Sequence, residues 1–533
     1  MNRNAHKTMN RNLLNLAILA ALYGLSGNVI ADNSTVTVNV SGNGQTLNID
    51  QTGGGGDAAT VTQNNGNGNA ETIGQQSSNN NQASILQGTN GGTSNGSKAD
   101  IEQQSSSSNN AGVNQGNGGG GYSSQSNTNG ANIYQQNGNN NAATINQASY
   151  DYYGVTSNSV ATIDQQNSNN NTATVNQGEN GSSADSSGAS IKQESGHNNT
   201  ATINQGTNGN SSVGNNATID QSGGTYNTAT ATQNNAGQTV TITQGGTTST
   251  SNSDQEGTGN TATINQQGQG NISNSTQNGI SGTANISQLG VTNTSTLNQT
   301  GSGNYAQVVQ PGFNNTATTT QDGDSGSSSI LQYSNTETAT VTQNAGGFGN
   351  QATVTQGGHN IYANLNTASI TQNGATSIAN ISQDDNNSYT NSTATVTQNP
   401  GNNNTASIAQ GAQSPGYANA ATITQTSDDN QAGITQNGQN NNASISQDSF
   451  AGNTSLNIAA IDQGNLVYSY NDTASITQQG SGNNGYIEQN GNGNTANINQ
   501  NGTGNTADIY QSSNGNTANI TQNGSFNNFK ITQ

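Results

Sequence analysis

The last 44 residues of the chain divide into four eleven-residue units: NGNGNTANINQ (490–500), NGTGNTADIYQ (501–511), SSNGNTANITQ (512–522) and NGSFNNFKITQ (523–533). Three units share the core Asn-x-Ala-x-Ile-x-Gln, and the fourth has Phe529 in place of the alanine. Self-similarity at a short, fixed period is the signature of a repeat architecture. The sequence therefore predicts a repeat array.

In each core, the Asn, Ala, Ile and Gln side chains are spaced two residues apart. A period of two places them on one face of a β-strand, whereas a helix would scatter them around its axis. The segments between the cores, such as 501–504, consist of the Gly, Asn and small polar residues that form tight turns. Each unit is therefore predicted to be a strand of about seven residues followed by a turn of about four.

One such strand cannot fold alone, because its Ala and Ile bury too little surface to offset roughly 1–2 kcal/mol of ordering entropy per residue. Stacking at ~4.8 Å would bury a continuous Ala/Ile seam and let identical Asn and Gln amides hydrogen-bond along the stack. A one-residue slip would bury Thr and Asn side chains without partners. The predicted structural ladder of the last units consists of Asn494, Ala496, Ile498, Gln500, Asn505, Ala507, Ile509, Gln511, Asn516, Ala518, Ile520, Gln522, Ile531 and Gln533.

The repeat glutamine occurs 39 times from Gln51 to Gln533. Between Gln233 and Gln343 the spacing is a constant eleven residues, whereas between Gln87 and Gln233 intervals of 12 alternate with intervals of 16 to 20. Such alternation is expected when two strands form one rung and insertions, such as 116–130 and 148–158, are surface loops at one edge. The prediction is an all-β fold: an amyloid-like β-solenoid of stacked parallel sheets, with two strands per rung and about 20 rungs.

The chain is predicted to have three segments. Residues 1–31 have the features of a secretory signal peptide, with a positively charged start, an apolar stretch within 13–25 and a cleavage site after Ala31. That apolar stretch is too short for a transmembrane helix, and no later segment is apolar enough to be one. Residues 32–44 form a lead segment in which 35–40 already alternates like a strand, and residues 45–533 form the repeat solenoid.

The composition excludes several classes of protein. Hydrophobic residues make up only 26% of the chain, well below the usual 45–50% of globular domains. After residue 31, three lysines and no arginine remain against 26 acidic residues, which argues against nucleic-acid binding. Cysteine is absent, so disulfides cannot staple the fold.

The sequence offers no support for catalysis or for a cofactor. The three histidines, His6, His197 and His359, are far apart in the sequence, and no His/Cys cluster suggests a metal site. The Gly-rich runs lack the flanking residues of a nucleophile elbow or a phosphate-binding loop. The protein is therefore predicted not to be an enzyme, with no cofactor and no metal.

Several units resemble the curlin repeat, the building block of curli fibres on Gram-negative bacteria. The matching stretches are NQASILQ (81–87), NTATVNQ (171–177), NTASITQ (366–372) and NTANITQ (516–522). The resemblance implies a functional amyloid subunit of the biofilm matrix, exported through an outer-membrane pore and polymerised on a nucleator subunit at the cell surface. The chain differs from a typical major curlin subunit in its greater length, its long insertions and the lack of an obvious pore-targeting segment.

Self-polymerisation is also expected from the last strand, which extends to residue 533 and would present an open edge to another chain. Replacing Gln522 and Gln533 with Ala is accordingly predicted to slow nucleation.

Two alternatives remain. One is a monomeric solenoid adhesin that binds through its loop insertions. The other is an ice-binding solenoid, because several cores carry outward Thr on both sides of the Ala, as in Thr172 and Thr174. Residues such as Ser369, Asn497 and Asp508 are expected to interrupt the flat threonine array that ice binding requires.

Overall fold

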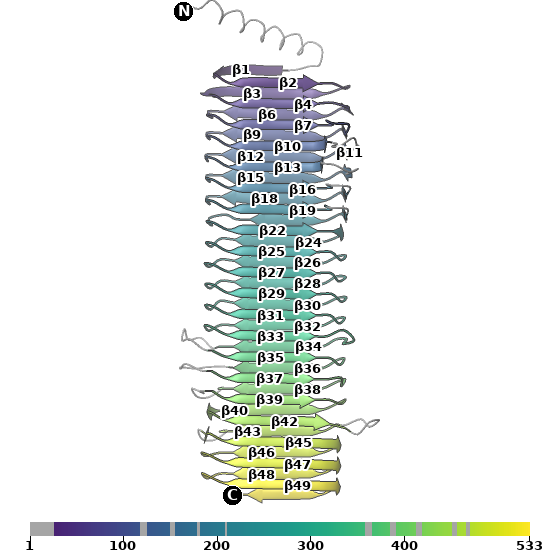
Figure 1. Ribbon diagram of the computed structural model, residues 1–533, viewed down its shortest axis with the longest axis vertical. Helices are drawn as coiled ribbons and strands as arrows, with labels where there is room; N and C mark the ends of the chain where they lie inside the picture. Colours follow the sequence, from purple (N-terminus) through teal and green to yellow (C-terminus); the bar gives the residue numbers. More distant parts are fainter. Residues whose placement is uncertain are drawn as a thin grey trace, which may run out of the picture. The chain divides into compact units, whose positions relative to one another are not determined.

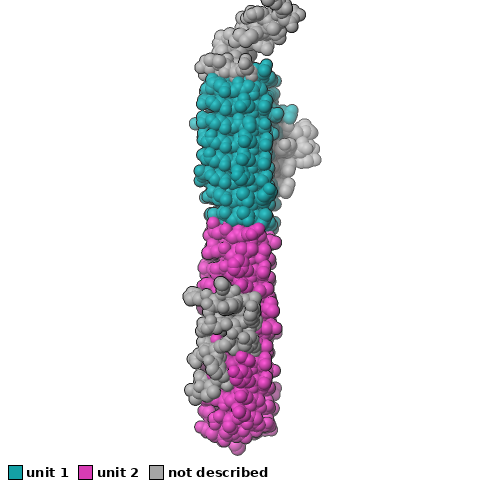
Figure 2. All heavy atoms as spheres, turned by 90° about the vertical axis from the view of Figure 1, so that its left-hand side faces the viewer, with its two compact units in different colours: residues 1–260 teal, residues 261–533 magenta. Residues whose placement is uncertain are grey.

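The computed structural model describes residues 26–533 apart from 118–124, 150–154, 179–181, 208–209, 358–364, 384–390, 412–417, 450–455 and 465–468. Most of the predicted signal peptide lies outside the described residues, and the segment boundaries at 31 and 44 stay predictions. The described chain consists of strands and turns, without a helix. It divides into two compact units, unit 1 (residues 1–260) and unit 2 (residues 261–533), which are coloured separately in Figure 2.

Unit 1 is built on two long parallel sheets, whose strands alternate along the chain (Figure 1). Sheet 1A consists of β1 (Ser26–Asp32), β3 (Thr46–Gly55), β6 (Ala70–Gln76), β9 (Lys98–Gln104), β12 (Gly130–Gln136), β15 (Val160–Gln166), β18 (Gly188–Glu194), β21 (Asn216–Asp220) and β24 (Thr239–Gln244). Sheet 1B consists of β2 (Thr35–Val40), β4 (Ala58–Gln63), β7 (Gln82–Gln87), β10 (Asn110–Asn117), β13 (Ala142–Ser149), β16 (Thr172–Gln177), β19 (Thr200–Gln205), β22 (Thr228–Gln233) and β25 (Thr250–Gln255).

A third, narrow sheet corrects one prediction from the sequence. Sheet 1C consists of β5 (Gly66–Asn67), β8 (Thr93–Asn95), β11 (Gln125–Asn127), β14 (Val155–Ser157), β17 (Ser183–Asp185), β20 (Ser211–Val213) and β23 (Asn235–Ala236). The insertions 116–130 and 148–158, predicted to be surface loops, thus end in the paired strands β11 and β14. The physical reason is a small central side chain, such as Ser126 or Thr156, which is fully buried while its strand pairs in parallel with the next.

Unit 2 has two long parallel sheets and one short pair of strands. Sheet 2A consists of β26 (Thr261–Gln266), β28 (Thr283–Gln288), β30 (Tyr305–Gln310), β32 (Ser327–Gln332), β34 (Gln351–Gln356), β36 (Ile378–Gln383), β38 (Thr405–Gln410), β40 (Gln431–Gln436), β43 (Ile458–Gln463), β46 (Asn484–Gln489), β48 (Thr506–Gln511) and β50 (Asn528–Thr532). Sheet 2B consists of β27 (Ile272–Gln277), β29 (Thr294–Gln299), β31 (Thr316–Gln321), β33 (Thr338–Gln343), β35 (Thr367–Gln372), β37 (Thr393–Gln398), β39 (Ala420–Gln425), β42 (Asn442–Asp448), β45 (Thr473–Ser481), β47 (Thr495–Thr503) and β49 (Thr517–Ser525). Strand β41 (Gly438–Gln439) pairs with β44 (Ser469–Tyr470).

The strands of each long sheet pair in parallel and in register. In unit 1, Ile133 pairs with Ile163 and Gln135 with Gln165, and in unit 2 Gln299 pairs with Gln321. Identical positions of the repeat therefore lie above one another, as a stacked solenoid requires. The predicted all-β solenoid, with two long strands per turn and stacked parallel sheets, is confirmed in both units.

The turns between strands explain why glycine recurs in the repeat. A Cβ added to Gly301 would lie 1.9 Å from the carbonyl oxygen of Gly323 in the next turn of the stack. Only glycine therefore allows the turns to stack as closely as the strands do. Two residues later, Gly303 has a positive φ of 66°, and Asn314 in the next connection along the chain has 55°. Gly and Asn are the residues that adopt this conformation most readily.

Candidate functional site

The candidate functional site is the set of contacts that joins each turn of the solenoid to the next. At its centre lies the apolar seam of Ala and Ile side chains between the two long sheets. In unit 2, Ala496, Ile498, Ala507 and Ile509 are each at most 1% exposed. A β-strand with Ala and Ile on one face buries them only when a second sheet covers that face. The seam therefore depends on both strands of a turn.

The repeat glutamines form continuous hydrogen-bonded ladders inside both units. In sheet 2B, Gln500 Nε2 donates to Gln522 Oε1 at 2.8 Å, and in sheet 2A, Gln511 Nε2 donates to Gln533 Oε1 at 2.9 Å. In sheet 1B, Gln147 Nε2 donates to Gln177 Oε1 at 2.8 Å in the same way. Because each amide is both a donor and an acceptor, the same hydrogen bond can repeat from turn to turn within each unit.

The second hydrogen of the glutamine amide joins the two sheets. Gln500 Nε2 in sheet 2B also donates to the backbone carbonyl of Asn484, at the start of strand β46 in sheet 2A, at 2.9 Å. Gln511 makes the reciprocal bond to Thr495 O at 3.2 Å. Both amide hydrogens are thus used in a position that is almost fully buried. This second bond was not foreseen from the sequence, because it depends on how the facing strands align.

The inward asparagines bond differently from the predicted amide-to-amide ladder. The backbone N–H of Asn516 donates to Asn494 Oδ1 at 3.0 Å, and Asn505 Nδ2 donates to the carbonyl of Gly524 at 2.9 Å. The Asn side chain therefore satisfies the backbone of the turn above it. At the end of sheet 2A, Asn527 Nδ2 does donate to Asn505 Oδ1, at 3.0 Å, so a direct amide contact exists as well.

Of the other residues of the predicted ladder, Ala518, Ile520 and Gln522 are buried. Ile531 and Gln533 lie in or beside the last strand and are more exposed. These two nevertheless stay in register, since Ile509 pairs with Ile531.

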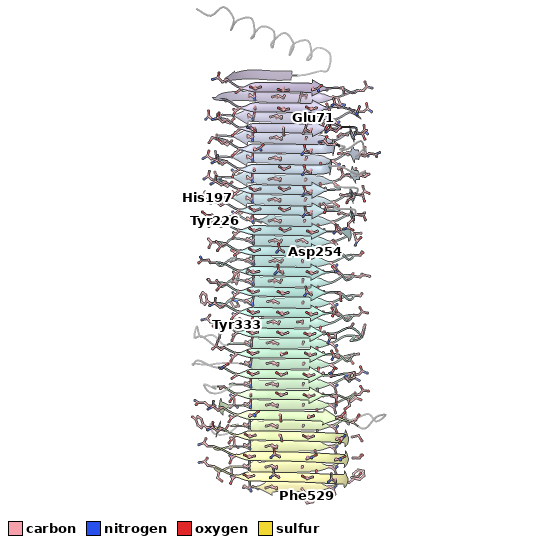
Figure 3. The ribbon with its side chains drawn as sticks, viewed as in Figure 1. Glu71, His197, Tyr226, Asp254, Tyr333 and Phe529 are labelled. Atoms are coloured by element: carbon pink, nitrogen blue, oxygen red, sulfur yellow. The ribbon has the colours of Figure 1, made fainter. Side chains whose placement is uncertain are left out.

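Buried carboxylates replace the repeat residue at a few positions. Glu71, labelled in Figure 3, stands at a position where most strands of sheet 1A have Ala, such as Ala99 in the next strand, and is 2% exposed. It accepts a hydrogen bond from Gln63 Nε2 of the facing sheet. Burial raises the pKa of Glu71 from 4.5 to about 8. Asp472 stands at an Asn position, accepts a bond from the Asn494 backbone N–H at 2.7 Å, and has its pKa raised by burial to about 6.

The outer faces of the sheets carry scattered polar groups. Lys192 Nζ lies 2.6 Å from Glu194 Oε2, and Tyr486 donates to Asp462 Oδ2 at 2.9 Å. His197 lies at the surface beside Asn169 (Figure 3). His6 and His359 lie outside the described residues. Within the described ranges, no three His, Cys, Asp or Glu side chains come together as metal ligands.

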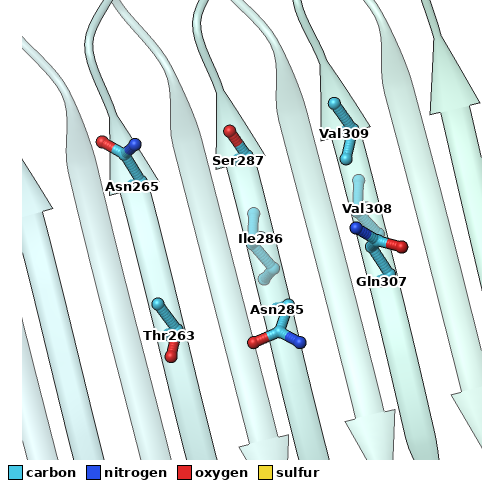
Figure 4. A pocket seen from close by; sticks show the side chains of 8 residues that line it. All are labelled: Thr263, Asn265, Asn285, Ile286, Ser287, Gln307, Val308 and Val309. Atoms are coloured by element: carbon cyan, nitrogen blue, oxygen red, sulfur yellow. The ribbon is translucent and has the colours of Figure 1, made fainter.

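A shallow hollow of about 290 Å³ lies on the outer face of sheet 2A. Figure 4 shows its lining side chains on three neighbouring strands, β26, β28 and β30. Its polar lining groups are the neutral hydroxyls and amides of Thr263, Asn265, Asn285, Ser287 and Gln307. None of these side chains is an acid, a base or an activated nucleophile, so the hollow offers no chemistry beyond weak hydrogen bonding.

Comparison with known proteins gives one family match. The model of the curlin-associated repeat matches residues 283–312 and 471–502. No curated protein matches the chain. Both matched segments lie in unit 2. The first begins with strand β28, and the second begins two residues before strand β45. In the part of the chain that the structure describes, no helix is long and apolar enough to span a membrane.

Proposed function

Because the chain contains curlin-associated repeats, we propose that it is a structural protein that self-assembles into curli-like amyloid fibres for adhesion and the biofilm matrix. The observation that carries this proposal is the ladder geometry. Each turn accepts a hydrogen bond at its glutamine Oε1 from one neighbouring turn and donates from the same glutamine's Nε2 to the other, as Gln321 does between Gln299 and Gln343. A turn of a second chain could therefore add to the stack with the bonds that already join successive turns.

The remaining elements of the proposal follow from the resemblance to curli. The chain would be exported with its signal peptide 1–31, leave a Gram-negative cell through an outer-membrane pore and polymerise on a nucleator subunit at the cell surface. Its principal partner would be a second copy of itself. The chain's excess of acidic residues, which argues against nucleic acid as a partner, agrees with this assignment.

A monomeric adhesin is the second candidate function, and one observation favours it. In unit 1, the predicted insertions 116–130 and 148–158 contain β11 and β14, which pair with each other, and β14 pairs in turn with β17 of sheet 1C. These long connections therefore belong to successive turns. Rows of insertions on one side are a common binding surface of repeat proteins.

A seeded assembly experiment separates the two candidates. The purified chain is followed by thioflavin T fluorescence with and without preformed fibres, and by sedimentation. A lag phase that seeds abolish, with fibre reflections near ~4.7 and ~10 Å, is expected for the amyloid subunit. Diffraction alone is not sufficient, since a monomeric solenoid has the same strand spacing.

The control uses seeds of an unrelated amyloid, which should leave the lag unchanged because their side-chain ladders do not match. A chain that stays monomeric at all concentrations, with or without its own seeds, would overturn the proposal. The adhesin would then be the better explanation.

A further inference from the structure

The outer face of sheet 2B carries an ordered array of threonines. Six successive strands, β29, β31, β33, β35, β37 and β39, each contribute three outward positions. Threonine fills 15 of these 18 positions: Thr294, Thr296, Thr316, Thr318, Thr320, Thr338, Thr340, Thr342, Thr367, Thr371, Thr393, Thr395, Thr397, Thr422 and Thr424. All of these side chains are exposed or half-buried. This set is called the threonine array.

The pairing register places the array in three straight columns. Thr318 pairs with Thr340, Ser369 pairs with Thr395, and Thr395 pairs with Thr422. Neighbouring members of a column are one strand apart, ~4.8 Å, and neighbouring columns are two residues apart, ~6.7 Å. The array is thus a regular two-dimensional lattice of roughly 24 by 13 Å.

The opposite sheet provides an internal comparison. Over β28, β30, β32, β34, β36 and β38 of sheet 2A, threonine fills only 4 of the 18 outward positions. The strand preference of threonine would act on both sheets alike. The concentration of threonine on one sheet therefore indicates a role for that surface rather than for strand formation.

The structure places two of the three interruptions expected from the sequence outside the array. Asp508 lies in β48 of sheet 2A, on the other sheet, and Asn497 lies in β47, outside the six strands. Ser369 lies within the array but keeps a hydroxyl in register with the threonines. The array is therefore interrupted at three of its 18 positions, Asn298, Ser369 and Ala420, whereas Asp508 does not interrupt it because alternate units of the repeat belong to different sheets.

The chemistry of the array limits what it can bind. Its six strands carry no charged and no aromatic residue, although the whole chain has a formal charge of −20. Protein interfaces depend on aromatic and Arg anchors, and nucleic acids require Lys or Arg. Aromatic rings, on which a sugar ring could stack, occur instead on sheet 2A, as with Tyr305. A neutral, flat and repetitive partner fits best.

We propose that the threonine array binds ice. Each threonine offers one methyl and one hydroxyl group, and its β-branched side chain is stiff, so little rotamer entropy is lost on binding. The hydroxyls can hold a layer of ordered water with the periodicity of the array. The methyl groups between them limit competing hydrogen bonds from liquid water. This activity is independent of fibre assembly, because the array lies on the side of the stack.

The test compares matched variants of the two sheets. Thr340→Tyr with Thr395→Tyr places two bulky rings in the central column of the array. Thr353→Tyr with Ser407→Tyr places them in the central column of sheet 2A, at the same separation of two strands. Thermal hysteresis and uptake of the purified chain into slowly grown ice are measured for each. The unmodified chain and the sheet 2A variant are expected to bind ice, and the array variant is expected to lose binding.

Circular dichroism and seeded assembly, which the outward substitutions should leave unchanged, show that the variants are folded. Exclusion of the unmodified chain from ice would overturn the proposal. Equal loss in both variants would overturn the assignment to sheet 2B. If the array variant instead abolishes a dimer seen by sedimentation, and ice is not bound, the array is an interface between two copies and the proposal is wrong.

Discussion

Units 1 and 2 have the same strand core but differ in the connections between their strands. In unit 1, strands that stack on one another are mostly 28 to 32 residues apart, and from β4 onward each connection from sheet 1B to sheet 1A includes a strand of sheet 1C. In unit 2, between β26 and β33, the stacked strands are 22 residues apart and the connections are five-residue turns. The glutamine ladder is nevertheless the same, with Nε2–Oε1 distances of 2.8 Å at both Gln165 and Gln299.

This comparison shows that the strand core, not the connection, determines the stack. Loop-closure entropy rises only slowly with loop length, so insertions at the edges are tolerated. A change inside the ladder cannot be tolerated in the same way, since it leaves buried amides without partners. The following predictions test this difference, beginning with the largest expected effect.

Removing one glutamine from the ladder should be costly in both units. Gln321 accepts from Gln299 and donates to Gln343 and to Tyr305 O. Gln321→Ala is expected to destabilise its turn by about 3–5 kcal/mol, because two neighbouring amides lose buried partners. Gln177→Ala should have a similar effect in unit 1. Amide hydrogen exchange near each site measures the loss, since a repeat array need not unfold in one step.

The outward substitution Ser329→Ala serves as the control and should leave exchange unchanged. A large loss of stability in one unit only would contradict the view that glutamine ladders stabilise both units to a similar extent.

The buried carboxylates should make stability depend on pH. The folded chain keeps Glu71 protonated up to about pH 8, whereas the unfolded chain releases this proton near pH 4.5. Stability therefore falls as the pH rises from 4.5 to 8, and the penalty is complete above that range. Glu71→Gln should raise the stability of unit 1 at alkaline pH and have little effect at acidic pH.

Asp472 should have the same kind of effect in unit 2, where stability falls as the pH rises from 3.8 to about 6. Asp472→Asn should therefore remove the pH dependence of stability in unit 2 over a lower pH range than the range affected by Glu71→Gln in unit 1. Exchange measured across the pH range for both variants checks the order of the two windows, and the reverse order would contradict it.

Sheet 1C should contribute locally and modestly. Ser126 Oγ accepts a bond from Asn129 Nδ2 at 2.7 Å and lies 3.1 Å from Ser97 Oγ. Ser126→Ala is expected to cost about 1–2 kcal/mol. Faster exchange should be confined to β8, β11 and β14, while β12 and β15 stay protected. Loss of protection throughout unit 1 would show that the connection does control the stack.

The smallest expected effect is a gain in stability. Ser273 in β27 occupies an inward position where sheet 2B has Ala in strands such as β31 and Ser295 in β29, and its buried hydroxyl has no hydrogen-bond partner among the described residues. Ser273→Ala should stabilise this turn by up to ~1 kcal/mol, because an unpaired polar group is removed from the core. Thermal unfolding and exchange at β27 and β29 measure the gain, and a loss would indicate an unrecognised bond.

Much of the fold could be predicted because its signal is local. The period-two spacing of Asn494, Ala496, Ile498 and Gln500 gives both the strand and its inward face. The alternating spacing of the repeat glutamines gives two strands per turn. Sheet 1C escaped prediction because a three-residue strand such as β11 carries no periodic pattern. The only sequence signal for sheet 1C is a small residue at the centre of each three-residue strand, such as Ser126 in β11.

The sequence by itself determined that the chain is a repeat solenoid with an Ala/Ile seam and glutamine at each strand end, because these features depend only on neighbouring residues. The tertiary structure alone decided which residues meet 22 to 32 positions apart. That register directs asparagine side chains to the backbone of the next turn, gives glutamines such as Gln500 a bond to the facing sheet and gathers the threonines on sheet 2B. Contacts across such separations follow from the closure of whole turns, which no single repeat specifies.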